Sequence, residues 1–276
     1  MAITTLLAVH AIDEPIETIN PIIELCGDLG AHLNLVVFGV MQTIPTASYG
    51  GMPDYYLTDE HDRIVREVRE RTAAVEAMIQ EAYLSASVLV ECIDAGMIGR
   101  TMSKHALYAD VTIFRNGSVP GSTFPTQAFN GVLFDSGQPV IALGAGDKPL
   151  PVVKRVIMAW NGEPEAARAI HCSLPLLQSV QDVHVVMIDP ETTKAGSNPG
   201  DDMAAFLTRH GLKVTVDRLS SGGREIGDVL LKHAEDTDAD LIVMGAYGHS
   251  RLREWLLGGT TRDLLAKAKL PVLMVH

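Results

Sequence analysis

A glycine-rich stretch near the end of the chain has a spacing that could bind an anion. It follows residues 240–244, Asp-Leu-Ile-Val-Met, an apolar run typical of a buried parallel strand. Its key positions are Gly245, Gly248, Gly258, Gly259 and Thr260. A glycine turn at the carboxyl end of a strand, ahead of a helix start, presents backbone N–H groups to an anion. Because glycine has no Cβ to hold a phosphate away, the stretch predicts a phosphate-binding turn.

The order Gly-x2-Gly-x9-Gly in this stretch resembles the nucleotide-binding signature of the universal stress protein family. The usual signature ends in Gly followed by Ser or Thr. Here Gly259 takes that last position, with Thr260 and Thr261 behind it. Two interpretations follow: the family's hydroxyl contact to phosphate is missing, or it lies one residue further along the chain.

The resemblance implies a bound adenine nucleotide, ATP or else ADP or AMP, which Mg²⁺ could accompany. Where the family commonly has an Asp turned toward the ribose, this chain has Asn161, whose amide can still donate and accept hydrogen bonds. Met187 and Met244 match positions that pack against adenine in the family. The residues implied for nucleotide binding are Ala159, Asn161, Gly162, Met187, Met244, Gly245, Gly248, His249, Gly258, Gly259 and Thr260.

A purely structural interpretation of the same residues stays open. The glycines could simply form turns, with Gly258 capping a short helix and the two methionines belonging to the core. The acidic residues near the site segments, Asp189, Glu254 and Asp263, fit surface charges better than a catalytic base. We therefore expect a binding protein, with no catalytic residue assigned. The alternatives are a slow ATPase or nucleotidyl transferase on the same site, and a nucleotide-free interaction scaffold.

No metal ligands are assigned from the sequence. Cys26, Cys92 and Cys172 are far apart and form no C-x-x-C pair. The ten histidines show no H-x-x-x-H spacing that would place two rings on one helix face. The cysteines are expected to be buried structural thiols.

The two halves of the chain repeat each other. Asp110 and Pro139 are 29 residues apart, while their counterparts Asp240 and Pro271 are 31 residues apart. Glu-Pro opens the first helix of each half, at residues 14–15 and 163–164. A repeat of this size predicts a duplicated domain with a boundary in the Gly- and Pro-containing residues 144–151. We expect two tandem domains, residues 1–146 and 151–276.

Each half is expected to be an α/β domain with a mostly parallel five-stranded sheet and helices on both faces. The resemblance makes these Rossmann-like domains of the adenine nucleotide alpha hydrolase kind. Strands are predicted over residues 3–9, 33–38, 87–93, 110–114, 139–143, 152–159, 183–188, 213–219, 241–244 and 271–275. A helix is predicted over residues 59–83, a long loop over 39–58, and a break or restart of the first helix at Pro21.

The first half lacks the glycine signature. Gly117 is present, but the two spacings fail, and Pro120 and Pro125 remove backbone donors. His10 and Ala11 were expected to stand where Asn161 and Gly162 stand later. The first domain is therefore predicted to be a degenerate copy. It is hypothesised to pair with the second domain, as single-domain relatives pair with a second chain, and a homodimer is a further possibility.

Composition excludes several classes of protein. Hydrophobic residues make up 47% of the chain and charged residues 20%, which is typical of a globular protein. The net charge of −12 argues against a nucleic-acid partner, because a phosphate backbone is bound by clustered Lys and Arg. No run reaches the roughly 18 apolar residues of a membrane span, and the N-terminus lacks a signal-peptide pattern. A cytoplasmic location is expected.

Overall fold

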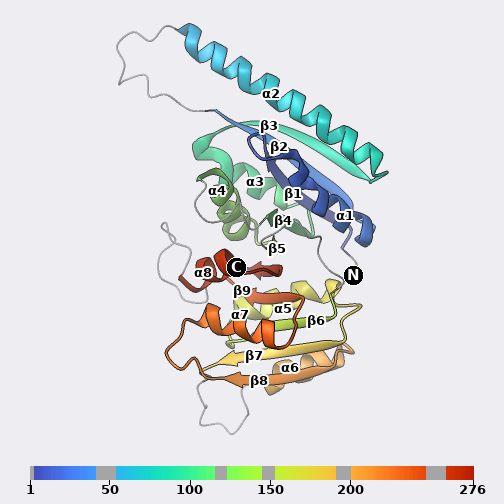
Figure 1. The fold of residues 1–276 in the computed structure, drawn as a ribbon, viewed down its shortest axis with the longest axis vertical. Helices are drawn as coiled ribbons and strands as arrows, with labels where there is room; N and C mark the ends of the chain where they lie inside the picture. The colour runs from blue at the N-terminus through green and yellow to red at the C-terminus, as the bar shows by residue number, and fades with distance from the viewer. Residues whose placement is uncertain (1–2, 42–53, 116–122, 145–152, 191–199, 247–258) are drawn as a thin grey trace. The chain divides into compact units, whose positions relative to one another are not determined.

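A computed structural model describes residues 3–41, 54–115, 123–144, 153–190, 200–246 and 259–276. The chain forms two compact units. We call Ile3–Phe114 with Gly121–Gln138 the N-terminal unit, and Pro139–His276 with the short pieces Met1–Ala2 and Arg115–Pro120 the C-terminal unit. Both units are α/β structures built on parallel strands, which confirms the predicted α/β fold class (Figure 1). Within the described residues the units have four and six strands, where five in each half were predicted. The predicted boundaries at residues 146 and 151 stay a prediction.

Within the described residues, the N-terminal unit has four parallel strands in the order β3-β2-β1-β4. These strands are β1 (Thr5–Ala11), β2 (His32–Met41), β3 (Ala86–Asp94) and β4 (Val111–Arg115). Its α-helices are α1 (Asn20–Leu29), α2 (Asp54–Glu81), α3 (Ile98–Ala106) and α4 (Thr123–Gly131), and its other turns of helix are η1 (Ile16–Ile19), η2 (Ala95–Met97) and η4 (Val132–Ser136). The predicted restart at Pro21 is confirmed, because α1 begins at Asn20 with Pro21 in its first turn.

The described part of the C-terminal unit has six strands in the order β5-β10-β9-β6-β7-β8. They are β5 (Val140–Leu143), β6 (Arg155–Ala159), β7 (Asp182–Ile188), β8 (Val214–Leu219), β9 (Leu241–Gly245) and β10 (Val272–Val275). Only β5, paired with β10, runs antiparallel among these. The helices are α5 (Pro164–Ser173), η5 (Leu174–Leu176), α6 (Asp201–Arg209), α7 (Ile226–Asp236) and α8 (Gly259–Lys267).

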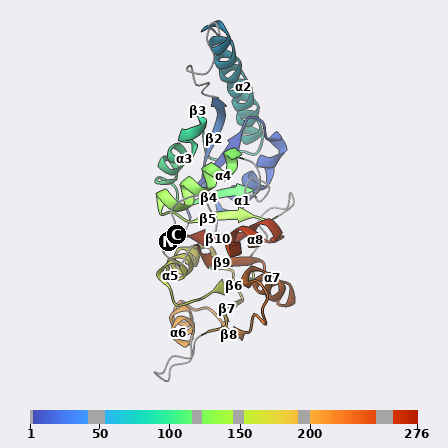
Figure 2. The same cartoon turned by 90° about the vertical axis from the view of Figure 1, so that its left-hand side faces the viewer.

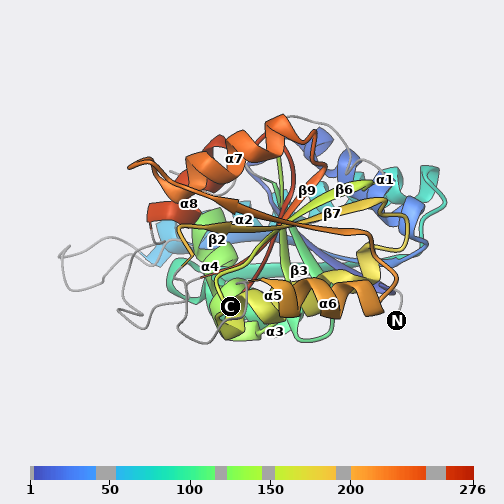
Figure 3. The same ribbon diagram turned by 90° about the horizontal axis from the view of Figure 1, so that it is seen from below.

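Helices cover both faces of the C-terminal unit's strands. Figures 2 and 3 show α5 and α6 on one face, and α7 and α8 on the other. This follows from right-handed crossovers, because the chain moves from β6 through β7 to β8 in one direction and then returns past β6 to β9 and β10. The central strands β6, β9 and β10 are therefore buried on both faces, which explains their nearly continuous apolar sequences, whereas the edge strand β8 is only partly buried and carries polar residues.

One aspartate in each unit ties two strand starts together, and this confirms the predicted correspondence of Asp110 and Asp240. The Asp110 Oδ2 atom accepts hydrogen bonds from the N–H groups of Thr4 (2.7 Å) and Thr5 (2.9 Å). Asp240 Oδ2 accepts in the same way from Lys154 (2.8 Å) and Arg155 (2.9 Å). The repeat seen in the sequence is thus a repeat of hydrogen bonding as well as of element order.

The predicted loop over residues 39–58 is too long at both ends. Strand β2 continues to Met41, and α2 already begins at Asp54, so the rest of that prediction lies outside the described residues. Gly39 sits under α2, and an added Cβ would lie 2.7 Å from side-chain atoms of Ile64 and Val68. The sequence pattern indicated a turn at this glycine. In the structure, Gly39 instead allows α2 to pack closely on β2. Within the described residues, no helix has the length and apolar character needed to cross a membrane.

Candidate functional site

The C-terminal unit has a topological switch point between β6 and β9. Strand β6 pairs with β7 on one side and with β9 on the other, while the chain connects β6 to β7 and reaches β9 only after β8. The crossover helices therefore leave these two neighbouring strands toward opposite faces. In open parallel sheets, ligands bind in the crevice outside the carboxyl ends of the strands at such a point.

The predicted residues Ala159, Asn161, Gly162 and Gly245 lie at this point. Ala159 pairs with Met244 on β9, and Gly245 ends that strand. The turn after β6 is exposed at Asn161 and Gly162. Gly162 has a φ of +84°, and no atom of the described residues lies within 4 Å of where its Cβ would be. This left-handed turn favours glycine and leaves open space beside the strand end.

The Asn161 side chain shapes the turn into α5. Its Oδ1 atom accepts a hydrogen bond from the Glu163 N–H group at 3.1 Å, an Asx turn immediately before the helix. Because this bond uses one lone pair of the carbonyl oxygen, the donors of the amide can serve another partner.

Gly245 has a packing role at the switch point. An added Cβ would lie 2.5 Å from the Ala166 backbone nitrogen and 2.6 Å from the Glu165 carbonyl carbon. The first turn of α5 thus rests directly on the end of β9, and the backbones can approach this closely only at glycine. This contact supports the structural interpretation for Gly245, whatever binds beside it.

Met187 and Met244 lie on opposite faces of the strands, so the structure does not bring these two side chains together. Paired residues of parallel strands share a face, and the register joins Met244, Ala159, Val186 and Asp217 in one row. Met187, the next residue after Val186, points to the other face. An added Cβ on Gly200 would lie 3.0 Å from its sulfur, which places Met187 near the start of α6.

The glycine stretch itself is described only at its two ends. Gly248, His249 and Gly258 lie outside the described residues. Gly259 and Thr260 open α8, and Thr261 is buried. Because α8 joins the parallel strands β9 and β10, its N-terminus lies at the carboxyl edge of the sheet. Free N–H groups in the first turn of a helix attract anions.

Asp189 links two loops at the same edge, a connection that sequence reasoning missed. The residue follows β7 with a φ of +47°, and its Oδ1 accepts a hydrogen bond from the Ser221 N–H group at 3.1 Å. Hydrogen bonds from the Ser221 side chain, then from its backbone, lower the pKa of the Asp189 carboxyl. The exposed Asp189 carboxylate therefore orders the Ser221-Gly222-Gly223 turn after β8. This structural role accounts for Asp189 without a catalytic one.

The matching edge of the N-terminal unit is closed by a side chain. Arg71 of α2 donates to the carbonyl oxygens of Ile12 (2.9 Å) and Glu14 (2.6 Å), and its Nη1 lies 3.2 Å from the ring nitrogen Nε2 of His10. His10 is only 2% exposed. A guanidinium group thus fills the turn that is open after β6.

The registers also correct the predicted correspondence of His10 and Ala11. Leu6 pairs with Val111 in one unit, as Val156 pairs with Leu241 in the other. Counting four residues on aligns His10 with Trp160, and therefore Ala11 with Asn161. The prediction was therefore wrong by one residue. The chain after β1 is one residue longer before its Glu-Pro pair than the chain after β6, so sequence spacing alone could not fix this alignment.

Parallel strands, helices on both faces and a switch point with a glycine-rich helix start define the C-terminal unit as a doubly wound α/β domain of the Rossmann-like kind. Residues 152–276 match the model of the universal stress protein family. This half of the chain is a universal stress protein domain, and the resemblance seen in the sequence is confirmed.

Individual relatives agree with this assignment. A universal stress protein of Synechocystis sp. is 28% identical over 130 residues, which are 46% of this chain and 44% of that protein. One from Methanocaldococcus jannaschii is 44% identical over 46 residues, 17% of this chain and 28% of the relative. The matched part is thus less than half of either curated relative.

A solved structure extends the similarity of fold to both halves. The crystal structure of a universal stress protein from Archaeoglobus fulgidus is similar to this chain with a TM-score of 0.66 and 19% identity, over 98% of this chain and 95% of the other. At that identity, the likeness shows the fold alone.

Proposed function

We propose that this chain binds ATP, or ADP or AMP, at the switch point of its C-terminal unit. The observation that carries the proposal is the start of α8 at Gly259, the last glycine of the glycine-rich stretch. This helix start lies at the same sheet edge as the open turn of Asn161 and Gly162. A nucleotide needs a phosphate site and a place for its sugar and base. The helix start supplies N–H groups for the phosphates, and the open turn leaves space beside them.

The remaining predicted residues receive different parts in this proposal. Asn161 would donate its amide N–H to a ribose oxygen, since its carbonyl oxygen already holds the turn. Met244 would contact adenine from the face that it shares with Ala159, whereas Met187 would support the other face from the core. Gly248, His249, Gly258 and Thr260 stay as predicted contacts of the phosphates, and Mg²⁺ would accompany them.

The proposal gives the chain one nucleotide site. Arg71 and the buried His10 occupy the corresponding turn of the N-terminal unit, and a bound nucleotide there would have to displace the guanidinium from two carbonyl oxygens. This contrast supports the interpretation of the first half as a degenerate copy. Its proposed role is to pair with the C-terminal domain.

The biological role that we propose is a ligand-dependent regulator or interaction module in the stress response of the cytoplasm. Nucleotide bound to the folded state stabilises it by mass action, so occupancy can bias domain pairing or the formation of a homodimer. Membership of the C-terminal half in the universal stress protein family supports this role.

Titration of the full chain with ATP tests the proposal. We expect Asn161→Ala to weaken ATP binding about tenfold, roughly the loss of one good hydrogen bond. Asp13→Ala is the matched control, because Asp13 is an exposed residue in the turn after β1. The ATP affinity of this variant should equal that of the unchanged chain. Equal losses in both variants, or no loss with Asn161→Ala, would count against the proposed site. Circular dichroism and melting temperature would check folding.

A further inference from the structure

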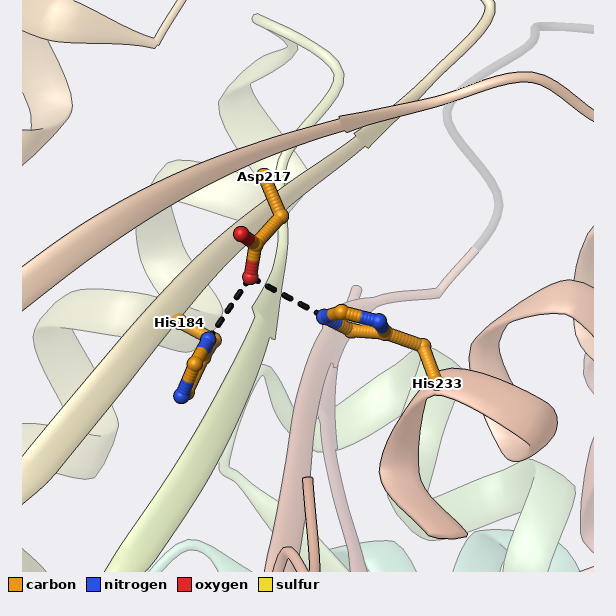
Figure 4. Close-up of side chains that lie close together, drawn as sticks. All are labelled: His184, Asp217 and His233. Carbon is orange, nitrogen blue, oxygen red and sulfur yellow. Dashed lines mark hydrogen bonds and ion pairs between the residues drawn. The ribbon is translucent and has the colours of Figure 1, made fainter. Parts of the chain in front are cut away.

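A second cluster of ligand-type side chains lies away from the switch-point turn, on the face of the C-terminal unit covered by α7. His184 of β7, Asp217 of β8 and His233 of α7 come together there, although 33 and 16 residues separate them in the sequence (Figure 4). His184 Nδ1 lies 2.6 Å from Asp217 Oδ2, and His233 Nε2 lies 3.0 Å from the same oxygen. All three ligand atoms lie within 4.8 Å of one another.

We propose that His184, Asp217 and His233 form a binding site for a divalent late transition metal ion, with Zn²⁺ as the preferred occupant. Two imidazole nitrogens and one carboxylate oxygen are the protein ligands of a common type of zinc site, which leaves a fourth position for water or another ligand. Imidazole is a poor ligand for Mg²⁺ and Ca²⁺, which take oxygen ligands, so these ions should not compete.

The distances fit after small side-chain movements. Tetrahedral zinc with bonds of about 2.0–2.1 Å holds its ligand atoms about 3.3 Å apart. The two nitrogen–oxygen contacts would therefore lengthen by less than about 1 Å, while the two nitrogens settle at a similar separation. The rings already stand nearly perpendicular, at 78°, with 5.9 Å between their centres. Two of the three residues are on strands, which fixes their backbone positions.

The charge of the cluster also favours a cation. The partners shown for Asp217 within the described residues are the two imidazoles, and its side chain is 21% exposed, beside rings that are 19% and 15% exposed. Both imidazoles approach the same oxygen of this carboxylate, so the cluster offers one anionic oxygen ligand beside two nitrogen ligands. A divalent cation can balance the charge of that carboxylate.

Without a metal ion, one N–H group of each imidazole donates a hydrogen bond to the Asp217 carboxylate. With a metal ion, the same two nitrogens present lone pairs, and the ring protons reside on the nitrogens that face away.

The test is calorimetric titration with Zn²⁺ of the untagged full chain, after bound nucleotide has been removed and metal ions have been stripped with EDTA. The expected result is one ion per chain. His184→Gln, His233→Gln and Asp217→Asn should each bind at least about tenfold more weakly. Asp217→Asn keeps an oxygen acceptor for both rings, so folding should survive it. Titration with Mg²⁺ should give no signal.

The matched control is the double variant His171→Gln with His210→Gln. These two exposed rings of the same unit contact Phe206, one tilted at 39° and the other edge-on at 62°, each with its centre 4.6 Å from that of Phe206. Their loss should leave Zn²⁺ affinity unchanged. In addition, Zn²⁺ should raise the melting temperature of the unchanged chain and of the control, but not of the three site variants. Absence of stoichiometric binding, or equal binding by the site variants, would overturn the proposal.

Discussion

At the scale of single residues, the aspartates Asp110 and Asp240 do the same work in the two units. Each accepts two backbone N–H groups at the start of a neighbouring strand through a single oxygen. The Thr4 hydroxyl adds a third donor at 2.9 Å in the N-terminal unit. A carboxylate satisfies these donors better than a neutral acceptor, because charge-assisted hydrogen bonds are stronger.

We predict that Asp110→Ala destabilises the chain by about 1 kcal/mol, since it leaves two strand N–H groups without their acceptor at an exposed site. Asp110→Asn should cost less, because its amide oxygen still accepts. Urea unfolding of the two variants measures the difference. Equal stability of Asp110→Ala and the unchanged chain would show that water replaces the carboxylate without loss.

The same aspartate predicts a dependence of stability on pH. Burial raises the pKa of Asp110, but hydrogen bonds from the N–H groups of Thr4 and Thr5 and from the Thr4 hydroxyl lower it by more. The pKa of Asp110 is therefore depressed. A depressed pKa in the folded state contributes stability above the unfolded pKa, and this contribution disappears as the pH falls through the folded value. The advantage of the unchanged chain over Asp110→Asn should therefore vanish in acid.

At the scale of elements, the contact between β9 and α5 limits what Gly245 can become. We predict that Gly245→Ala destabilises the chain by about 1–3 kcal/mol, because its Cβ would meet backbone atoms of Glu165 and Ala166 that cannot rotate away. Gly27→Ala is the control, since it lies in α1 with no atom within 4 Å and should be neutral or slightly stabilising. Unfolding of both variants at the same urea concentration would contradict the close contact between β9 and α5.

The order and type of the elements could be predicted from the sequence, whereas the partners across strands could not. Apolar runs bounded by Asp, Gly and Pro mark the strands, and the prediction places ten of them where the structure has β1 to β10. The face of each side chain depends on register. Met187 and Met244 looked equivalent in sequence, yet pairing places them on opposite faces. A shift of one residue would reverse this.

The cluster of His184, Asp217 and His233 escaped notice for the same reason. A search for histidines spaced along one helix cannot find ligands from two strands and a helix. If β7 and β8 are taken as parallel neighbours, however, Val186 pairs with Asp217. His184 lies two residues before Val186 and points to the same face, so His184 and Asp217 lie on one face of the sheet. Strand adjacency was therefore the signal that could have found two of the three residues.

At the scale of the whole molecule, the two units share one order of strands but differ in the turn after the first strand of each. Arg71 closes this turn in the N-terminal unit, and the turn is open in the C-terminal unit. The first four strands of each half follow the same spatial order, β3-β2-β1-β4 and β8-β7-β6-β9. The duplication was visible in the sequence. The closure of one copy was not, because Arg71 and His10 are 61 residues apart and meet only after α2 has packed on its unit. The contrast of a closed and an open turn is the basis for proposing a single nucleotide site.

The most direct test of that site is to denature freshly purified chain and identify any released nucleotide by chromatography and mass. We predict close to one adenine nucleotide per chain, with clearly less from Asn161→Ala. A chain that releases none and also fails to bind added ATP would contradict the account. The glycine stretch and the switch point would then be structural features only, and the interaction scaffold would become the leading interpretation.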